Sequence, residues 1–464
     1  MKKTVFKVMI PKNAPDLNEA FGSVRDADEA RLILHHLFKI RLMLKQHKNL
    51  APGISREAGW CPVKSKTLKF MLGDKYKKVI DQLIALGVIE LQMNPITGRK
   101  NYAPKFFSLK YRVLLGSGTP NDPRKYRVEH ITDPFIVKKI SYFYQTQYKN
   151  QVKEFKEKSP WYLPNLNFIE GLYFDDAVFD FACLQGEKTD YYLGIINEFN
   201  NGTGKFIVQD DFSGRIHTHI CAIPKLLRPY LRHKDIEESL LITDVKSAQP
   251  YLISILLYLP QLIQQLIPEF TPIIDKLTPF QSKPDVRLFY EDCASGAFYP
   301  KWMEVTGLSK DKAKTSLFKH VFYSSASNHN KDISVREERL KMRQAFSTMY
   351  PNVYQTLTSL KRTRRKVLPF VYELTKKGKK QGRMYVVPNM MAQRLEVAIL
   401  LNLITKKCNE EGILCSTIHD AWILKESDLE KFNIIFADTF QKQGIKAPQL
   451  APELLKERHN SIAL

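Results

Sequence analysis

Apolar residues in the first quarter of the chain change from helical to strand-like spacing. Between Asp74 and Gly87 they recur at intervals of three or four residues, which predicts a helix with one buried stripe: Tyr76, Val79, Ile80, Leu83 and Ile84. We expect Asp74 to cap this helix and Gly87 to end it. A strand is predicted over 88–91, a turn over 94–98 and a returning strand over 106–113.

This order of helix, strand, turn and basic strand resembles the winged-helix modules of replication initiators and regulators. Arg99 and Lys100 would lie in the wing. The resemblance implies that residues 1–125 form a winged-helix-like domain that binds duplex DNA. Docking to another protein, or to the rest of the chain, is the alternative.

A long helix with basic and aromatic residues is predicted within residues 130–160. Its basic and aromatic positions are Lys138, Lys139, Tyr142, Tyr144, Tyr148, Lys149, Lys153, Lys156 and Lys158. Such a surface can follow a phosphate backbone and stack on bases. Alternatively, the lysines form a solvated face and the tyrosines face the core. After residue 200, strands and helices mix without regular alternation, which indicates an α+β fold.

Two aspartates far apart in the sequence each lie next to short apolar runs. Asp244 ends the predicted strand that starts at Leu240, and Pro250 opens an apolar helix after it. Asp420 follows His419 at the tip of a predicted hairpin over 415–422. Two such carboxylates can share a pair of Mg²⁺ ions that hold the attacking and leaving oxygens of a phosphoryl transfer. The alternatives are a helix-capping aspartate and a hydrogen-bonded His–Asp pair.

Three further segments carry candidate chemistry. Lys310, Lys314, Phe318 and Phe322 recur every four residues on one helical face, where lysines can neutralise a triphosphate and phenylalanines can stack on sugar and base. An amphipathic helix with a phenylalanine core is the alternative. In the Ser213-Gly214-Arg215 segment, Arg215 offers a rigid fork for phosphate. Polar residues share one face of a predicted apolar helix: Asn389, Gln393 and Glu396.

Charge and composition narrow the class of partner. The 464 residues include 71 Lys and Arg against 48 Asp and Glu, a net charge of +23 that favours a polyanionic partner such as DNA or RNA. No apolar run reaches the length of a membrane span, and the N-terminus does not read as a secretory signal. The six cysteines form no CxxC pair, so we expect free thiols and a cytoplasmic protein.

Taken in order, these segments resemble the single-subunit polymerase superfamily, which contains DNA polymerase I-like (family A) DNA polymerases and phage-type RNA polymerases. The resemblance spans roughly residues 160–464. It implies a right-hand polymerase fold behind the winged-helix-like domain (1–125). Its regions would be a thumb-like helical region (126–210), a first palm segment (211–300), fingers (301–380) and a second palm segment (381–464).

The resemblance also assigns roles to individual residues. Asp244 and Asp420 would be the catalytic metal ligands, with the Val245 carbonyl as a further ligand. Nucleotide-binding roles fall on Lys310, Lys314, Phe318, Phe322, Tyr323 and Gln249, and primer-template roles on Arg215, Asn389, Gln393 and His419. The implied cofactor is two Mg²⁺ ions, with Mn²⁺ as a substitute.

The sequence also departs from the family pattern. Gln249 stands where the family's DNA polymerases have a glutamate that excludes ribose, and Ala421 stands where many have glutamate after the His–Asp pair. Phe322 replaces the usual tyrosine, and a slip of one residue would give that place to Tyr323. The first 150 residues carry no acidic set of a proofreading exonuclease.

We therefore expect a template-directed DNA polymerase without proofreading that extends a primer with deoxynucleotides. The family resemblance implies a divergent member from a phage or other mobile element. Its partners would be DNA primer-template, nucleoside triphosphates and, through the N-terminal domain, duplex DNA, with no membrane. The alternatives are a phage-type RNA polymerase or primase, and a non-catalytic DNA-binding replication initiator.

Overall fold

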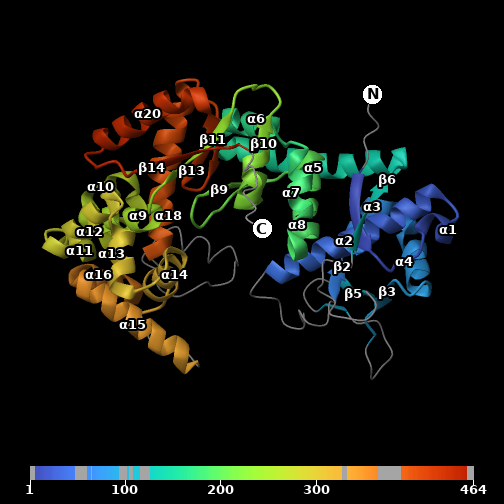
Figure 1. Cartoon of the computed structure of the whole chain (residues 1–464), viewed down its shortest axis with the longest axis horizontal. Helices are drawn as coiled ribbons and strands as arrows, with labels where there is room; N and C mark the ends of the chain where they lie inside the picture. The colour runs from blue at the N-terminus through green and yellow to red at the C-terminus, as the bar shows by residue number, and fades with distance from the viewer. Residues whose placement is uncertain are drawn as a thin grey trace. The chain divides into compact units, whose positions relative to one another are not determined.

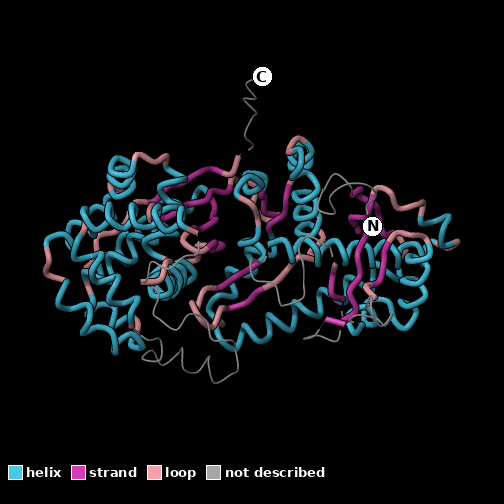
Figure 2. The backbone as a smooth tube through the Cα atoms, turned by 90° about the horizontal axis from the view of Figure 1, so that it is seen from below, coloured by secondary structure: helices cyan, strands magenta, loops and turns pink. Residues whose placement is uncertain are grey.

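A computed structural model describes residues 6–46, 60–63, 65–93, 102–103, 108–114, 126–326, 332–363 and 388–456. The chain divides into two compact units, one of residues 1–152 and 173–206 and one of residues 153–172 and 207–464 (Figure 1). Both mix helices and strands, and helix is the larger share of each (Figure 2). The predicted turn, Arg99 and Lys100 lie outside the described residues. The five-region division predicted from the sequence is finer than these two units and stays a prediction.

The first unit is built from short antiparallel sheets and helices around one apolar core. Its elements are β1 (Phe6–Pro11), α1 (Leu17–Phe21), α2 (Val24–Gln46), β2 (Cys61–Val63), α3 (Ser65–Leu72), α4 (Tyr76–Ala85), β3 (Ile89–Leu91), β4 (Tyr102–Ala103), β5 (Ser108–Val113), β6 (Tyr126–Ile131), α7 (Ala177–Cys183) and α8 (Thr189–Asn200). Helix α5 (Pro134–Lys158) and strand β7 (Leu172–Phe174) cross the division between the units.

The helix and strands predicted over 74–113 are present. Strand β3 pairs antiparallel with β5, so that Ile89 lies opposite Val113, and β5 also pairs with β2 and β4. Gly87 ends the turn after α4 with a φ of +66°. The predicted cap is wrong, because Asp74 forms an ion pair with Lys69 at 2.8 Å and no side chain caps α4. The winged-helix assignment itself stays a prediction.

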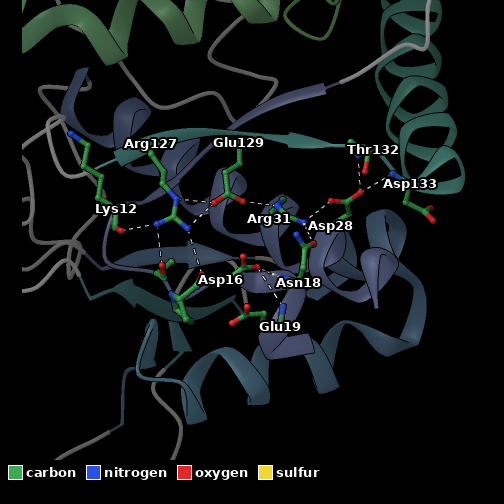
Figure 3. A network of polar contacts seen from close by, with 12 residues as sticks. Lys12, Asp16, Asn18, Glu19, Asp28, Arg31, Arg127, Glu129, Thr132 and Asp133 are labelled. Atoms are coloured by element: carbon green, nitrogen blue, oxygen red, sulfur yellow. Dashed lines mark hydrogen bonds and ion pairs between the residues drawn. The ribbon is translucent and has the colours of Figure 1, made fainter. Parts of the chain in front are cut away.

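A buried network of charged groups joins α2 to β6 and to the start of α5 (Figure 3). The Arg31 guanidinium donates to Asp28 Oδ1 at 2.9 Å and to Glu129 Oε2 at 2.6 Å. The second oxygen of Asp28 accepts the backbone N–H groups of Thr132 and Asp133, each at 2.7 Å. Since the Asp28 side chain is fully buried, these bonds replace its lost water.

The second unit contains the strands and helices in which the candidate chemistry was predicted. Its strands are β8 (Ile207–Gln209), β9 (Ile216–Thr218), β10 (Leu231–His233), β11 (Leu240–Val245), β12 (Cys415–Ile418), β13 (Ala421–Lys425) and β14 (Leu450–Leu454). Its helices are α6 (Leu163–Gly171), α9 (Ala248–Tyr258), α10 (Pro260–Leu266), α11 (Thr271–Leu277), α12 (Pro284–Ser295), α13 (Phe298–Thr306), α14 (Lys310–Ser316), α15 (Ile333–Met349), α16 (Pro351–Arg362), α18 (Pro388–Glu396), α19 (Lys406–Glu410) and α20 (Leu429–Lys442).

Four antiparallel strands in the order β12-β13-β11-β14 form the central sheet of this unit. The sequence pattern predicted β11 and the β12–β13 hairpin, and both are present. Trp422 of β13 is fully buried; its indole N–H donates to Thr405 Oγ1 at 2.9 Å, and its ring packs against Phe432 of α20. Helices α10 to α16 gather beside α9 and α18 (Figure 1).

Helix α6 supports the hairpin that carries His419 and Asp420. The Asn165 side chain donates to the backbone carbonyl of Cys415 at 2.8 Å, and the Tyr162 hydroxyl lies 2.6 Å from Thr417 Oγ1. Both groups are buried, so these bonds are not exchanged for bonds to water. They fix the hairpin close to its tip.

Two helices of the second unit contain π-helical segments, in which the backbone bonds to the fifth residue rather than the fourth. Residues Leu317–Phe322 continue α14 and Val397–Thr405 continue α18 in this way. Within the described residues, no helix is both long enough and apolar enough to span a membrane.

Candidate active site

The two predicted aspartates lie on neighbouring segments of the central sheet. Asp244 pairs with Ala421 across β11 and β13, and the backbone N–H of Val245 donates to the Asp420 carbonyl at 3.1 Å. Asp420 therefore directly precedes the residue opposite Asp244. The hairpin turn and the end of β11 meet because the register between β11 and β13 is fixed by the buried apolar residues on both strands.

Backbone strain is concentrated next to both carboxylates. In the described part of the chain, the non-glycine residues with positive φ are Ser247 at +58° and His419 at +56°. His419 directly precedes Asp420, and Ser247 lies three residues after Asp244. Such conformations cost on the order of 1–3 kcal/mol each and tend to persist at functional sites.

Desolvation raises the pKa of both carboxyl groups. The pKa of Asp244 rises to about 6, first because the surrounding protein displaces water and then because of the charge on Asp420. The Asp244 side chain is exposed, so part of this effect is screened by solvent. Burial likewise raises the pKa of Asp420, whose side chain is half-buried. Such a pair gains stability from a bound cation.

Basic groups from separate segments of the chain act on this carboxylate pair. Lys314 lowers the pKa of both aspartates. Its predicted role in binding a triphosphate stays a prediction. Arg228 also lowers both, and Lys225 lowers that of Asp244. Lys225 and Arg228 were not assigned to the site from the sequence, although their basic segment ends only a few residues before β11. Lys310 lies one turn before Lys314 and is exposed.

Arg215 is held by a short structured turn between β8 and β9. Asp210 accepts the backbone N–H and the hydroxyl of Ser213 at 2.8 and 2.6 Å, and Gly214 adopts a φ of +76°. A side chain at Gly214 would be strained at this φ. The turn directs the Arg215 guanidinium to Glu396 on α18, with Nε donating to Oε1 at 2.8 Å and Nη2 donating to Oε2.

Glu396 also binds Gln249 of α9, whose Nε2 donates to Oε2 at 3.0 Å. Burial raises the pKa of Glu396 to about 7, while the bonds from Arg215 and Gln249 act in the opposite direction. The sequence placed Glu396 on one face with Asn389 and Gln393 but gave it no role. Asn389 and Gln393 are both half-buried on α18, and Asn389 Oδ1 has no hydrogen-bond partner among the described residues.

The π-helical segment gives Phe322 and Tyr323 different surroundings. The Tyr323 N–H bonds to the Phe318 carbonyl at 2.8 Å, five residues back, so Tyr323 continues the face that Lys310, Lys314 and Phe318 begin. Tyr323 is half-buried, and its pKa responds to Arg215, Glu396 and Asp420 besides its burial. Phe322 is fully buried and packs edge-on against Phe346 at 5.9 Å.

We therefore expect one substitution in this helix to affect mainly nucleotide binding and another to affect mainly stability. Tyr323→Ala should raise the KM for nucleotide about tenfold, the effect of roughly 1.4 kcal/mol of lost contact, and should change thermal stability little. Phe322→Ala should cost about 3–5 kcal/mol of stability, as buried phenylalanines do. Single-nucleotide incorporation and thermal unfolding of both variants measure this. The reverse pattern would place Phe322 at the nucleotide.

His419 lies edge-on to His217, with ring centroids 5.3 Å apart. Burial, together with Arg215, lowers the pKa of His419 to about 4, so the ring is neutral at pH 7. Its Nδ1 has no hydrogen-bond partner in the described residues. A neutral ring with a free nitrogen can bond to a substrate but adds no charge to the site.

Tyr299 of α13 is a further neighbour that the sequence did not indicate. Burial raises the pKa of its hydroxyl, and Cys293, Tyr323 and Asp420 add to this effect. Its hydroxyl is buried and has no hydrogen-bond partner within the described ranges. Tyr299 and Asp420 are far apart in the sequence, so only the fold can bring them close enough to interact.

Asp244 and Asp420 are the acidic ligands that this site can offer to a metal. In the described part of the chain, no cluster of three or more His, Cys, Asp or Glu residues could hold a metal ion. Mg²⁺ is commonly held by one or two carboxylates, with water and substrate phosphates as the other ligands. Two adjacent carboxylates with raised pKa values fit such a cation.

Comparisons with known proteins found little similarity. No protein-family model matches the chain, and no curated protein sequence matches it. Among solved structures, the chain is similar to the POL domain of Pol1 from M. smegmatis in complex with DNA primer-template and dNTP. The TM-score is 0.32 and the sequence identity 10 %, over 68 % of this chain. The chain spans 65 % of the length of that domain.

Proposed function

We propose that this chain is a template-directed nucleotide polymerase with Asp244 and Asp420 as its catalytic carboxylates. The observation that carries the proposal is their adjacency on β11 and the β12–β13 hairpin, with the bases Lys314, Lys225 and Arg228 acting on them. A carboxylate pair surrounded by fixed positive charge suits a polyanionic substrate that brings its own phosphates. The net charge of +23 suits a nucleic-acid template.

In this proposal the two aspartates hold divalent cations, Mg²⁺ with Mn²⁺ as a substitute. When bound, these cations supply Lewis acidity at the attacking hydroxyl and charge neutralisation at the leaving pyrophosphate. Lys314 binds the triphosphate, and the Phe318 and Tyr323 rings contact sugar and base. Arg215 and His419 hold the primer end, while Asn389 and Gln393 bind primer-template.

We propose that the substrate is a deoxynucleotide added to a primer 3′ end, as in family A DNA polymerases, without proofreading. The partial burial of Gln249 and its bond to Glu396 support a fixed side chain beside the sugar. We assign duplex DNA binding to the first unit as a winged-helix-like module. An origin in a phage or other mobile element belongs to the same proposal.

The test is extension of a 5′-labelled primer on a DNA template with Mg²⁺, run separately with deoxynucleotides and ribonucleotides. Templated extension with deoxynucleotides would support the proposal. Extension with ribonucleotides alone, or unprimed synthesis, would indicate an RNA polymerase or primase. No synthesis in any arm would contradict the polymerase proposal.

Lys314→Ala should raise the KM for nucleotide about 10- to 100-fold, the loss expected for a charge-assisted hydrogen bond. Lys312 lies on the same helix, carries the same charge and is exposed, so Lys312→Ala is the matched control. Steady-state kinetics of single-nucleotide incorporation measures both variants. If both substitutions raise the KM equally, Lys314 contributes only general surface charge and does not bind the triphosphate specifically.

A further inference from the structure

We propose that Glu396 is a positioning residue that holds the Arg215 guanidinium away from Asp420, so that the carboxylate pair stays free to bind divalent cations. This inference rests on the proposed function. It adds a residue that none of the polymerase-like segments assigns. It concerns the binding of divalent cations by this chain in the absence of substrate.

The Glu396 carboxylate is held from two sides at once. It is 2 % exposed and accepts two N–H groups from Arg215 and one from Gln249. Because an ionised carboxylate only accepts hydrogen bonds, Gln249 must present its amide nitrogen to it. The carboxylate is thereby fixed in the plane that pairs with the guanidinium.

The three partners come from distant parts of the chain. Arg215 lies 181 residues and Gln249 147 residues from Glu396 in sequence. The β8–β9 turn, α9 and α18 therefore converge on one buried carboxylate. Arg394 anchors the same turn to α18, since its guanidinium donates to the carbonyls of Phe212 at 2.8 Å and Asp211 at 2.7 Å.

Arg215 lies beside the hairpin tip that carries Asp420. Arg215, Glu396 and His419, the residue directly before Asp420, line one small pocket. The charge of Arg215 also lowers the pKa of Asp420. An arginine forms its strongest pair with a carboxylate when two N–H groups bind two oxygens. As long as Glu396 supplies those oxygens, Arg215 is not available for the same pairing with Asp420.

Loss of the Glu396 charge weakens the pairing of Arg215 with Glu396 relative to its pairing with Asp420. A glutamine at 396 keeps the size of the side chain but offers one acceptor oxygen instead of two. The guanidinium then finds its best remaining carboxylate partner at Asp420, where it would displace a cation. The expected consequence is weaker binding of Mg²⁺, which a purely structural role of Glu396 would not produce.

The experiment measures Mg²⁺ binding by the full chain without substrate, from the thermal shift as Mg²⁺ is titrated. Glu396→Gln should raise the half-saturating Mg²⁺ concentration about tenfold, which corresponds to roughly 1.4 kcal/mol. In Glu396→Gln combined with Arg215→Met, that concentration should return to within about twofold of the native value, because the competing guanidinium is gone. The Mg²⁺ concentration needed for primer extension should likewise be higher in Glu396→Gln than in the native protein. The double variant should regain the low Mg²⁺ requirement but not full activity.

Two further variants keep the test decisive. Arg215→Lys retains Glu396 and the charge but cannot form the forked pair, so it should also raise the Mg²⁺ requirement. Arg215→Lys can replace Glu396→Gln in the test if the latter does not fold. Asp285→Asn weakens the cap that Asp285 provides to Asn352 and Val353 in the same unit, and should lower thermal stability without changing the half-saturating Mg²⁺ concentration.

An unchanged Mg²⁺ requirement in both Glu396→Gln and Arg215→Lys would overturn the inference. So would a double variant that binds Mg²⁺ no better than Glu396→Gln. A native protein that binds Mg²⁺ but extends no primer would contradict the proposed function while leaving this test readable. A native protein with no thermal response to Mg²⁺ would overturn this inference, whereas primer extension decides the proposed function separately.

Discussion

Asp420→Asn is expected to lower kcat/KM for templated extension by about 10³-fold, roughly 4 kcal/mol of transition-state stabilisation. Asparagine keeps the size of the side chain but removes the charge that would bind the cation. Asp244→Asn should act similarly, because the two carboxylates form one site. Single-turnover extension with Mg²⁺ measures the loss. Asp275→Asn on α11, which removes an exposed carboxylate, is the control and should extend normally.

The same substitution at Asp244 should make the protein more stable when Mg²⁺ is absent. The pKa of Asp244 is about 6 in the folded chain against an ordinary 3.8, so the folded state binds this proton more tightly than the unfolded state. Native stability from this group is therefore present below pH 3.8 and lost as the pH rises through about 6. Asparagine does not titrate, so Asp244→Asn should unfold at a higher temperature than the native protein at pH 7 in EDTA.

Two conditions should remove that difference. Below pH 3.8 the native carboxyl group is protonated in both states, and the two proteins should converge. Adding Mg²⁺ at pH 7 should stabilise the native protein and not the variant, because only the native protein keeps the carboxylate pair. Retained extension in either asparagine variant would contradict the assignment of Asp244 and Asp420.

Asp28→Ala is expected to destabilise the first unit by about 3–5 kcal/mol, the cost of breaking a buried ion pair at one partner. The substitution leaves Arg31 with Glu129 as its one carboxylate partner in this network, beside the Asn18 side chain, and removes the acceptor for the N–H groups of Thr132 and Asp133. These bonds join α2 to the end of β6 and the start of α5, so the loss should spread beyond α2 (Figure 3).

Hydrogen exchange in the full chain locates this effect. Amides of α2 and β6 should exchange much faster in Asp28→Ala, while those of β11 and β13 in the second unit should keep their native rates. Glu19→Ala removes an exposed carboxylate near the same network and serves as the control. Faster exchange in the second unit alone would contradict a local role for the network.

The sequence by itself determined the elements that carry the candidate chemistry. Apolar runs of strand length end at Asp244 and flank Asp420, and the β11 strand and the β12–β13 hairpin form there. Periodic apolar residues likewise marked α4, because local spacing decides which face a helix or strand can bury. The cap at Asp74 failed because Lys69 offered that carboxylate an ion pair instead.

Tertiary structure alone decided which residues meet at the site. The face of Tyr323 follows from a π-helical segment, and a pattern of every fourth residue had pointed to Phe322. Glu396 gained its role only when Arg215 and Gln249 reached it from segments more than a hundred residues away. Lys225 and Arg228 act on Asp244 for the same reason. Periodicity reports the burial of a single element, whereas electrostatic partners depend on how several elements pack, which no local pattern encodes.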